Sequence, residues 1–372
     1  MSQDPRRPLV AVDARMLDAS GIGTYLQNVL RRLVAAGPQW RLLLLGDPDV
    51  LARQAWSRAP GVQVIAHRAP LYGLRGQMLP VAARQLSPDL LWVPHYNIPL
   101  AWRGRLLVTV HDLAHLALPE VFGRGARRVY ACLTFAAVRR RAAGLLYVSR
   151  FSREEFHRLV GSPRGVEWVV PNGVDREWFA ASRPAPAERP YFVYVGNVKP
   201  HKNLVRLLEA FATVAPELPH DLVLAGRRRG FLTGDPEVAR RAEGLGERVR
   251  FTGFLETEEL RRAVAGAAAL VLPSLYEGFG LPAIEAMACG RPVLAARAGA
   301  LPEVCGDAAL YCDPLDPRDI AAGLRRLASD SGLASRLAAA GAERARRFDW
   351  DETAAGVSEA INQIISEPRR AG

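Results

Sequence analysis

Residues 270–290 read LVLPSLYEGFGLPAIEAMACG, and this stretch decides the fold. The apolar run Leu270–Pro273 predicts a buried strand, and Leu281–Gly290 predicts a helix. A proline at the helix start is favourable, because its missing N–H has no intrahelical partner to lose. The glycines of the intervening loop let the backbone approach a ligand, and free N–H groups at the helix start suit an anion such as a phosphate. The order of strand, glycine loop and helix is typical of a ligand-binding α/β domain.

Two carboxylates bracket this loop. Glu277 lies in the loop and Glu285 on the second turn of the predicted helix, so both can face one pocket. Acidic side chains near a helix N-terminus also stabilise the helix without any further role. Two of them around a Gly-x-Gly loop that follows a buried strand favour a ligand site.

Short apolar runs alternate with helical patterns along the whole chain, which predicts the α/β class with parallel sheets covered by helices on both faces. In the first half the predicted strands are 9–15, 40–46, 62–68, 91–95, 106–111, 145–149 and 166–170, and the helices are 24–36, 125–143 and a capped helix from Ser152. In the second half the strands are 191–196, 221–226, 249–255, 270–273 and 292–296, and the helices are 203–215, 257–267, 281–290, 319–328, 333–348 and 353–365.

A proline-rich segment interrupts this alternation near the middle of the chain. Residues 179–190 read FAASRPAPAERP, which cannot continue a helix or a central strand. We therefore predict two Rossmann-like domains, residues 1–180 and 181–350, followed by a helix in 351–372 that returns to the first domain. Ligands of open parallel sheets bind outside the carboxyl ends of the strands, so a cleft between the two domains is the expected site.

The 372 residues contain 49 Lys+Arg and 38 Asp+Glu, a net charge of +11. Residues 1–180 hold 24 arginines and 13 acids, so the excess lies in the first half, while residues 181–372 hold 25 of each sign. Lys199 and Lys202 are the only lysines. The sequence has no secretory signal, no apolar run long enough to span a bilayer and no CxxC among its four cysteines. We expect a reduced, cytoplasmic protein without structural zinc.

The predicted first strand is followed by SGIGTY, which opens a helix. Gly21 and Gly23 form a Gly-x-Gly pair, but a dinucleotide fingerprint needs a third glycine where Leu26 stands. The pair is weak support for a nicotinamide cofactor, and a purely structural turn is the alternative.

His111 ends an apolar strand at the edge that faces the predicted cleft. Asp112 follows it and could orient the imidazole ring. A histidine satisfied within the core is the alternative. His95 and His115 fit a structural role better, and the three histidines have no metal-ligand spacing with carboxylates.

Arginines cluster on and beside the predicted helix 125–143, at Arg103, Arg105, Arg127, Arg128 and Arg139–Arg141. A basic face on an amphipathic helix can bind anionic lipid headgroups or a pyrophosphate-linked lipid acceptor. A solvated surface is the alternative. Nucleic acid is disfavoured, because no recognition motif accompanies the charge.

Five segments in the same order resemble family 4 glycosyltransferases of the GT-B fold. They are VPNGVD (170–175), YVGNVKPHKNL (194–204), FTGFL (251–255), EGFGLPAIEAMACG (277–290) and FDWDETA (348–354). The resemblance covers nearly the whole chain and implies two Rossmann-like domains that face each other across a cleft. It is specific for fold and enzyme class, and much less so for the sugar.

The resemblance implies roles by position. Lys202 would bind the donor diphosphate, Glu285 the ribose hydroxyls, and Glu277 with the following amides the transferred sugar. The implied catalytic residues are His111, which would contact that sugar, Lys202 and Glu277. The implied donor-binding residues are Gly21, Gly23, Asn197, Lys199, Lys202, Phe254, Leu255, Glu277, Gly278, Phe279, Gly280, Leu281 and Glu285. Many family members carry an arginine where Asn197 stands, so Lys199 could supply that charge, or Lys202 could bind the phosphates alone.

The implied activity is retaining transfer of a hexose, with mannose from GDP-mannose preferred, to a glycan or polyprenyl-pyrophosphate-linked acceptor in polysaccharide biosynthesis. Neither a cofactor nor a metal is expected. The alternatives are a sugar-nucleotide epimerase of the same fold, glucosyl or N-acetylglucosaminyl transfer from a UDP-sugar, a non-catalytic binder and a dehydrogenase. A peripheral contact with the inner face of the plasma membrane, through the basic first domain, stays open.

Overall fold

The computed structural model describes residues 7–71, 74–123, 125–181, 188–226 and 235–367. The chain forms two compact units: a first unit of residues 1–173 with 350–372, and a second unit of residues 174–349. The first unit ends at Gly173 rather than at the predicted residue 180, because the short helix α8 (Arg176–Phe179) packs against α12 (Leu281–Ala288) of the second unit.

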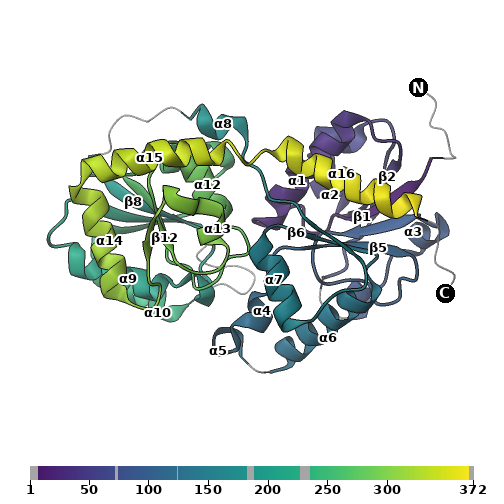
Figure 1. Ribbon diagram of the computed structural model, residues 1–372, viewed down its shortest axis with the longest axis horizontal. Helices are drawn as coiled ribbons and strands as arrows, with labels where there is room; N and C mark the ends of the chain where they lie inside the picture. The colour runs from purple at the N-terminus through teal and green to yellow at the C-terminus, as the bar shows by residue number, and fades with distance from the viewer. Residues whose placement is uncertain (1–6, 72–73, 124, 182–187, 227–234, 368–372) are drawn as a thin grey trace. The chain divides into compact units, whose positions relative to one another are not determined.

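Among the described residues, seven parallel strands form the sheet of the first unit, in the order β3-β2-β1-β4-β5-β6-β7. They are β1 (Leu9–Asp13), β2 (Arg41–Gly46), β3 (Val62–Ala66), β4 (Leu90–Val93), β5 (Arg105–Val110), β6 (Gly144–Tyr147) and β7 (Val166–Val169). The helices are α1 (Ile22–Ala36), α2 (Pro48–Ala52), α3 (Val81–Gln85), α4 (Ala114–Ala117), α5 (Pro119–Phe122), α6 (Ala126–Arg141), α7 (Arg150–Leu159) and α16 (Trp350–Ser366). In Figure 1, α1 and α16 cover one face of this sheet, and α6 and α7 cover the other.

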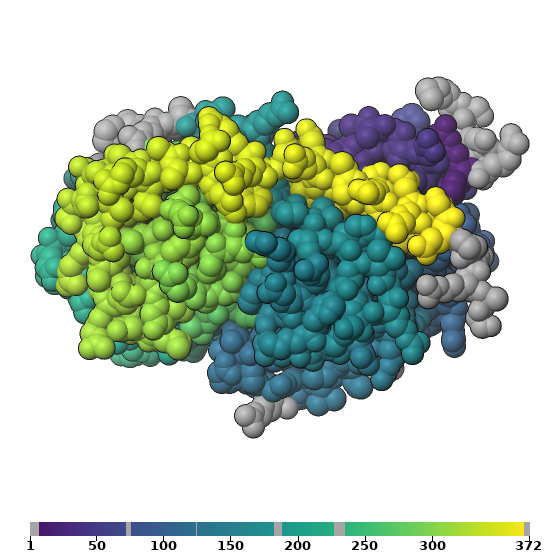
Figure 2. Space-filling model, in the orientation of Figure 1, coloured from purple at the N-terminus to yellow at the C-terminus, as the bar shows by residue number. Residues whose placement is uncertain are grey.

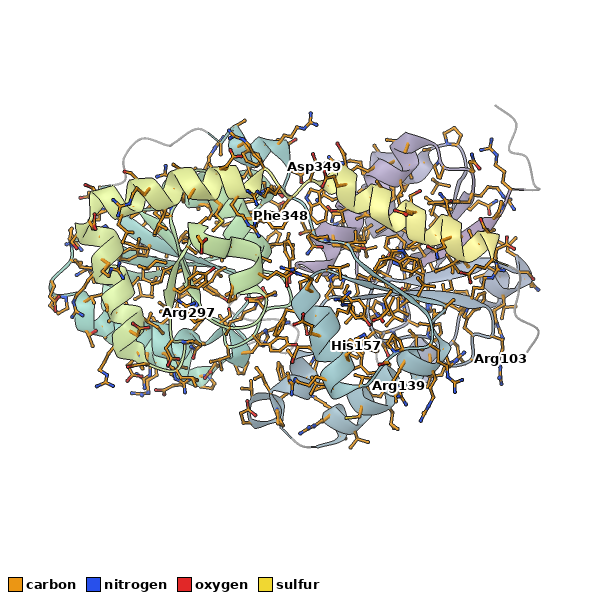
Figure 3. All side chains as sticks on the ribbon, in the orientation of Figure 1. Arg103, Arg139, His157, Arg297, Phe348 and Asp349 are labelled. Carbon is orange, nitrogen blue, oxygen red and sulfur yellow. The ribbon has the colours of Figure 1, made fainter. Side chains whose placement is uncertain are left out.

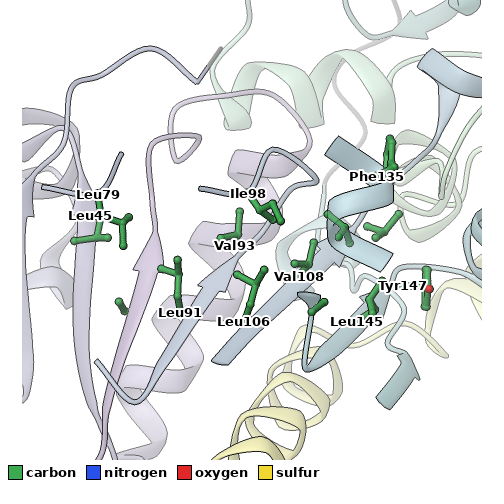
Figure 4. Packing of buried hydrophobic residues seen from close by; sticks show 14 of the residues in the cluster. Leu45, Leu79, Leu91, Val93, Ile98, Leu106, Val108, Phe135, Leu145 and Tyr147 are labelled. Carbon is green, nitrogen blue, oxygen red and sulfur yellow. The ribbon is translucent and has the colours of Figure 1, made fainter. Parts of the chain in front are cut away.

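The inner strands of this sheet are mostly apolar, because helices cover both of their faces. Every residue of β4, which reads LLWV, is buried. Figure 4 shows one layer of the core, where side chains of neighbouring strands line up, among them Leu45, Leu91, Leu106 and Leu145.

The C-terminal helix α16 completes the first unit. It packs against α1, and Figure 2 shows it in yellow on the surface beside the purple N-terminal segments. Several side-chain hydrogen bonds hold it in place; for example, Thr353 Oγ1 donates to the Pro171 carbonyl at 2.7 Å, and Trp40 Nε1 donates to Asn362 Oδ1 at 3.0 Å. The chain thus ends in the unit in which it begins.

Six parallel strands of the described chain form the sheet of the second unit, in the order β10-β9-β8-β11-β12-β13. They are β8 (Tyr191–Val195), β9 (Asp221–Ala225), β10 (Val249–Gly253), β11 (Ala269–Leu272), β12 (Val293–Ala296) and β13 (Leu310–Cys312). Besides α8 and α12, the helices are α9 (Leu204–Val214), α10 (Pro236–Gly244), α11 (Thr257–Ala265), α13 (Leu301–Cys305), α14 (Pro317–Ser329) and α15 (Ser331–Ala345). The predicted α/β class with two Rossmann-like units is confirmed.

The structure differs from the prediction in several local details. Helix α7 begins at Arg150 and its cap is Ser149, whose Oγ accepts from the Ser152 backbone N–H at 3.0 Å. The predicted start at Ser152 was wrong, because that residue is buried within the helix. Strand β13 and helices α2, α3, α4, α5, α8, α10 and α13 were not predicted. The strand has only three residues, too few for a recognisable alternation.

Candidate active site

The candidate site lies at the carboxyl ends of β8 and β11, which are neighbours in the second sheet. The strand order reverses at this point, because β8 continues to β9 on one side and β11 to β12 on the other. Open parallel sheets form a ligand-binding crevice at such a switch point. The loops 196–203 and 273–280 follow the two strands here.

The Glu277 carboxylate is bound to the Lys202 ammonium at this switch point. Lys202 Nζ donates to Oε1 at 2.7 Å and to Oε2 at 2.8 Å, and Ser274 Oγ donates to Oε1 at 2.7 Å. The side chains keep 21% (Lys202) and 11% (Glu277) of their exposure, while Ser274 is fully buried. The pair is therefore held from below by a serine and remains accessible to a ligand.

The backbone around Glu277 is held in place as well as its side chain. The Ala300 N–H donates to the Glu277 carbonyl at 2.9 Å. Gly299 has a φ of +60°, and a Cβ there would lie 2.6 Å from the Glu277 backbone nitrogen and oxygen. Gly280, with a φ of +96°, precedes the first turn of α12. Both positions require glycine: Gly299 because the Glu277 backbone approaches it closely, and both because their backbone has a left-handed conformation.

Lys202 ends a single 3-10 turn, η3 (Pro200–Lys202), and the next residue fixes its position. Asn203 is buried with a left-handed φ of +61°, which asparagine tolerates. Its Nδ2 donates to the Pro273 carbonyl at 2.9 Å and to the Pro314 carbonyl at 2.7 Å. The Leu275 N–H donates to the His201 carbonyl at 2.8 Å. The lysine loop is thus fastened to the loop that carries Glu277.

The other two predicted positions of the first loop lie between β8 and η3. The hydroxyl of the fully buried Tyr194 donates to the Asn197 carbonyl at 3.2 Å and holds the loop near its start. The side chains of Asn197 and Lys199 are half-buried. Both therefore lie on the loop that presents Lys202.

Glu285 lies on the second turn of α12, partly buried and close to Asp175. Burial and then the negative charge of Asp175 raise the pKa of Glu285 to about 8. Within the described chain no hydrogen bond joins its carboxyl to the Lys202–Glu277 pair. Glu285 is therefore a largely protonated acid at neutral pH and can donate a hydrogen bond as well as accept one.

The remaining predicted donor-binding residues of the second unit differ in exposure. Phe254 and Leu255 follow β10, where the Phe254 side chain is 59% exposed and Leu255 is half-buried. Gly278 is buried, and the Phe279 ring packs edge-on against Phe348, with 5.6 Å between the ring centroids. The Phe279 side chain is thus part of the core, which leaves only its backbone to face a ligand. Leu281 is the first residue of α12.

His111 follows β5 in the first unit. Its Nε2 lies 3.1 Å from the Pro94 carbonyl oxygen, and its ring packs edge-on against Tyr25 at 4.9 Å. Because a carbonyl can only accept, Nε2 carries the hydrogen and Nδ1 is left with a lone pair. Burial lowers the pKa of His111 to about 4, so the ring is neutral at pH 7. Asp112, which we expected to orient the ring, instead accepts from the Ala114 N–H at 3.0 Å.

Gly21 and Gly23 begin α1 after β1. Gly21 has a φ of +59° and precedes the first helical residue. A Cβ on Gly23 would lie 2.7 Å from the Leu17 carbonyl oxygen. Both glycines therefore have a structural reason within the loop itself.

A buried ion pair in the first unit was not predicted as a feature. Arg15 Nη2 donates to Asp13 Oδ2 at 2.6 Å and Nε donates to Oδ1 at 2.9 Å. His95 Nε2 lies 3.3 Å from Asp13 Oδ2, and His95 Nδ1 accepts from the Asn97 N–H at 3.1 Å. The only sequence signal was the D-x-R spacing at the end of the first strand. His95 has the structural role that we expected.

Two further findings concern the described residues alone. They contain no group of three or more His, Cys, Asp or Glu side chains placed to hold a metal ion. They also contain no helix with the length and apolar character needed to cross a bilayer.

The sequence matches known families over both units. Residues 19–178 match Glycosyltransferase Family 4, and residues 189–330 match Glycosyl transferases group 1. O-antigen chain mannosyltransferase B of Escherichia coli is 31% identical, over 89% of this chain and 93% of that protein. D-inositol 3-phosphate glycosyltransferase of Nocardioides sp. is 35% identical, over 95% of this chain and 87% of that protein.

Solved structures share the fold. Anabaena Alr3699/HepE in complex with UDP-glucose superimposes with a TM-score of 0.75 at 21% identity, covering 96% of this chain and 99% of that one. The match extends over both units, and the GT-B architecture predicted from the sequence is confirmed.

Proposed function

The chain belongs to glycosyltransferase family 4, and from this premise we propose that it transfers mannose from GDP-mannose to a hydroxyl of a glycan or a polyprenyl-pyrophosphate-linked acceptor, with retention of the anomeric configuration. Glycosyl transfer itself follows from the family. The choice of mannose is supported by the E. coli relative, which is named as an O-antigen chain mannosyltransferase. The observation that carries the site assignment is the accessible Lys202–Glu277 pair at the switch point of the second sheet.

Lys202 would act on the leaving group. When the bond between the anomeric carbon and the diphosphate oxygen breaks, negative charge develops on that oxygen, and an ammonium placed beside it stabilises the transition state. Lysine provides a compact point charge with three donors, two of which Glu277 engages. Rigid attachment through Asn203 means that little reorganisation is needed when the donor binds.

Glu277 would hold the transferred sugar rather than attack it. Its two oxygens already accept three hydrogen bonds, from Lys202 and Ser274, which makes a carboxylate a weak nucleophile. Sugar hydroxyls can donate to its remaining lone pairs, and the amides of Gly278 to Gly280 would complete the contact. His111 would accept a further sugar hydroxyl through Nδ1, because its Nε2 is committed to Pro94.

A front-face reaction then explains how the anomeric configuration is retained. The acceptor oxygen bonds to the anomeric carbon on the face from which the diphosphate departs. The acceptor proton passes to the departing phosphate oxygen, so the leaving group acts as the base. No covalent enzyme intermediate is formed, and Lys202 with backbone amides supplies the charge stabilisation that a metal ion supplies elsewhere.

A UDP-sugar is the second candidate donor. Alr3699/HepE, which shares the fold, was solved with UDP-glucose. Glu285 would bind the ribose in either nucleotide, so it does not select between the two bases. Phe254 and Leu255, near the expected position of the base, are the residues through which the base would be selected.

The experiment is a matrix of donors and products. The protein is incubated with GDP-mannose, UDP-glucose, UDP-N-acetylglucosamine or ADP-glucose, with and without a polyprenyl-pyrophosphate-linked acceptor. NMR of the product gives the anomer, and a parallel reaction contains EDTA. The proposal requires acceptor-dependent transfer from GDP-mannose, an α-linked product and full activity in EDTA.

Each part of the proposal can fail separately. Epimerisation of the donor without an acceptor would replace transfer by the epimerase alternative. Transfer from a UDP-sugar alone would show that the donor is not GDP-mannose. A product of inverted configuration would exclude the front-face route. Loss of activity in EDTA would show that the reaction needs a metal ion. Glu217→Gln, which breaks an exposed ion pair to Arg325 away from the site, is the control for Glu277→Ala, which we expect to abolish transfer with the fold retained.

A further inference from the structure

Helix α6 of the first unit carries apolar side chains on its outward face. Its buried face, Ala131, Thr134, Phe135 and Val138, packs into the core. On the opposite side Val129 is 56% exposed and Leu133 is 68% exposed, and the two are one helical turn apart. The solvent face of a surface helix is ordinarily polar. Two large aliphatic side chains at the centre of this face need another explanation.

Segments bonded to α6 carry two further exposed apolar side chains. Gln77 Nε2 donates to the Tyr130 hydroxyl at 2.8 Å, which places the segment before α3 against α6. Arg141 Nη1 donates to the Leu100 carbonyl at 2.7 Å, and the Leu100 N–H donates to Gln77 Oε1 at 3.2 Å. Met78, the residue after Gln77, is 55% exposed, and Leu100 is 50% exposed. We call Met78, Leu100, Val129 and Leu133 together the α6 patch.

Arginines surround the α6 patch without acidic partners. Helix α6 contains five arginines and no acidic residue. Arg128 and Arg139 lie on one side of the outward face and Arg140 at its end, while Arg103 follows the Leu100 loop. Figure 3 shows Arg139 on this helix and Arg103 at the edge of the same unit. Among the residues that the structure describes, no carboxylate lies within ion-pair distance of these four arginines. Arg103 and Arg140 are exposed, so their charge is available to an external anion.

We propose that the α6 patch docks the protein on an anionic phospholipid surface. The aliphatic side chains would enter the boundary between headgroups and acyl chains, and the arginines would contact lipid phosphates. Exposed apolar side chains combined with unpaired positive charge are the features that such a surface binds. This inference does not depend on the sugar or the reaction, because the docking surface lies wholly within the first unit.

Two other occupants fit this surface less well. Nucleic acid would use the arginines but gains nothing from Val129 and Leu133, which have no base or backbone group to match. A second copy of the chain, packed through a two-fold axis, would bring the same patch against itself. Its arginines would then face arginines, at an electrostatic cost.

The test measures vesicle binding of the full chain without donor or acceptor. Vesicles of phosphatidylcholine alone are compared with vesicles that also contain phosphatidylglycerol, by co-sedimentation at low and high salt. We expect binding to the anionic vesicles only, and weaker binding at high salt. Leu133→Ser should weaken it roughly tenfold, since an inserted leucine is lost. Arg140→Ala should weaken it about fivefold.

Matched variants keep composition and net charge equal. Leu315→Ser removes a leucine that is 63% exposed in the second unit, and Arg336→Ala removes an exposed arginine of α15. Both should bind as the unaltered protein does, and thermal melting should show all four variants folded. Equal binding by Leu133→Ser and Leu315→Ser, or equal binding to neutral vesicles, would overturn the proposal.

Two further outcomes would also overturn it. If duplex DNA displaces the vesicles and binds Leu133→Ser as tightly as the unaltered protein, the surface is a nucleic-acid site. If no vesicle binds and sedimentation shows a dimer that Leu133→Ser dissociates, the patch joins two copies of the chain. Because none of these measurements requires turnover, failure of the docking proposal leaves the proposed transferase activity untouched, and the converse also holds.

Discussion

The two sheets place an ion pair at the same topological position, between the carboxyl ends of two neighbouring central strands. In the first unit Asp13 ends β1 and pairs with Arg15, next to His95 after β4. In the second unit Lys202 follows β8 and pairs with Glu277 after β11. The side chains of the first pair are 2% (Asp13) and 4% (Arg15) exposed, whereas those of the second are 11% (Glu277) and 21% (Lys202) exposed.

The difference in burial distinguishes a pair suited to a structural role from a pair that we propose to be functional. Arg15 also directs Nη1 to the carbonyls of Ala69 and Gly76, so its donors are used within the unit. A buried pair must be satisfied in this way, because desolvation of two charges otherwise exceeds their attraction. Lys202 and Glu277 keep part of their surface in contact with solvent, where a ligand can exchange for water. One pair should therefore govern stability and the other activity.

The largest effect is expected from the buried pair. Asp13→Asn leaves the Arg15 guanidinium buried without its counter-charge and should lower the free energy of unfolding by about 3–5 kcal/mol. Asp316→Asn is the control, because Asp316 and Arg318 have the same spacing and a similar two-point contact but an arginine that is 91% exposed. Urea denaturation followed by circular dichroism measures both. Equal losses in the two variants would contradict the structural role of the Asp13 pair.

The same pair gives the protein a pH dependence in acid. Burial raises the pKa of Asp13, but hydrogen bonds from Arg15 and His95 outweigh it and hold the pKa below its usual value of 3.8. The unfolded chain therefore binds the proton more readily than the folded one. The contribution of Asp13 to stability is complete above the unfolded pKa and is lost as the pH falls through the folded pKa. Asp13→Asn should lack this acid-dependent loss.

Substitutions in the accessible pair should reduce activity and leave stability almost unchanged. Lys202→Ala removes the charge beside the leaving group and should lower kcat/KM by about two to three orders of magnitude, with little change in melting temperature. Glu277→Gln should also reduce transfer, and the double variant should lose less than the sum, because the two side chains act as a unit. Arg325→Ala, which removes a cation from an exposed pair, controls for net charge. Unchanged donor affinity in Lys202→Ala would refute the assignment.

The sequence predicted candidate site residues of the second unit but not how they interact. Glu277 and Lys202 were both identified, yet they lie 75 residues apart, and only the adjacency of β8 and β11 joins them. Ser274 and Asn203 were missed for the same reason, because their partners are a carboxylate in a loop and the carbonyls of two remote prolines. Strand and helix periodicity predicts elements, whereas the contacts between loops depend on strand order.

The first unit shows where local patterns mislead. Asp112 is adjacent to His111 in sequence, which suggested that it orients the ring. The ring instead bonds to Pro94, at the end of the neighbouring strand β4, because residues that end adjacent parallel strands face each other. The D-x-R of Asp13 and Arg15 resembles an ordinary surface pair such as Asp316 and Arg318. Burial alone distinguishes the two, and burial is a property of the assembled sheet.

Glu285 should show that a binding residue can be costly to the fold. Its pKa of about 8 means that folding must keep it protonated while the unfolded chain ionises near 4.5. The folded state then binds more protons, so this group lowers stability progressively as the pH rises from 4.5 to 8. Glu285→Gln should raise the free energy of unfolding at pH 8 by a few kcal/mol, of the order expected from that shift. It should also flatten the pH dependence measured by thermal melting between pH 5 and pH 8.

Glu285→Gln should weaken donor binding, although it stabilises the fold. The amide nitrogen that Glu285→Gln introduces can only donate, whereas the hydroxyl of the protonated carboxyl can also accept, so KM for the donor should rise although the fold is more stable. A variant that is less stable at pH 8, or one with unchanged KM, would contradict the role given to Glu285.

Asn203 tests whether the accessible pair depends on its support. Asn203→Gly keeps the left-handed backbone but removes the amide that bonds to Pro273 and Pro314, so two buried carbonyls lose their donor. Stability should fall by about 1–3 kcal/mol and KM for the donor should rise, because Lys202 is the adjacent residue. Arg206→Ala, which removes only the contact to Asn203 Oδ1, should change neither by a comparable amount. A loss of stability with KM unchanged would make Asn203 purely structural.

The smallest effect is expected at Lys199, the other lysine of the loop after β8. If Lys199 supplies the charge that the family resemblance implies at the position of Asn197, Lys199→Ala should raise KM for the donor several-fold, and Lys199→Arg should restore it. The side chain is half-buried, so its interaction with a diphosphate is partly screened, and the difference between Lys199→Ala and the unaltered protein should shrink as salt is added. Lys202→Ala should show less salt dependence, because its contacts are shorter and better shielded. Equal KM values for Lys199→Ala and the unaltered protein at low salt would leave Lys202 as the cation that binds the diphosphate from this loop.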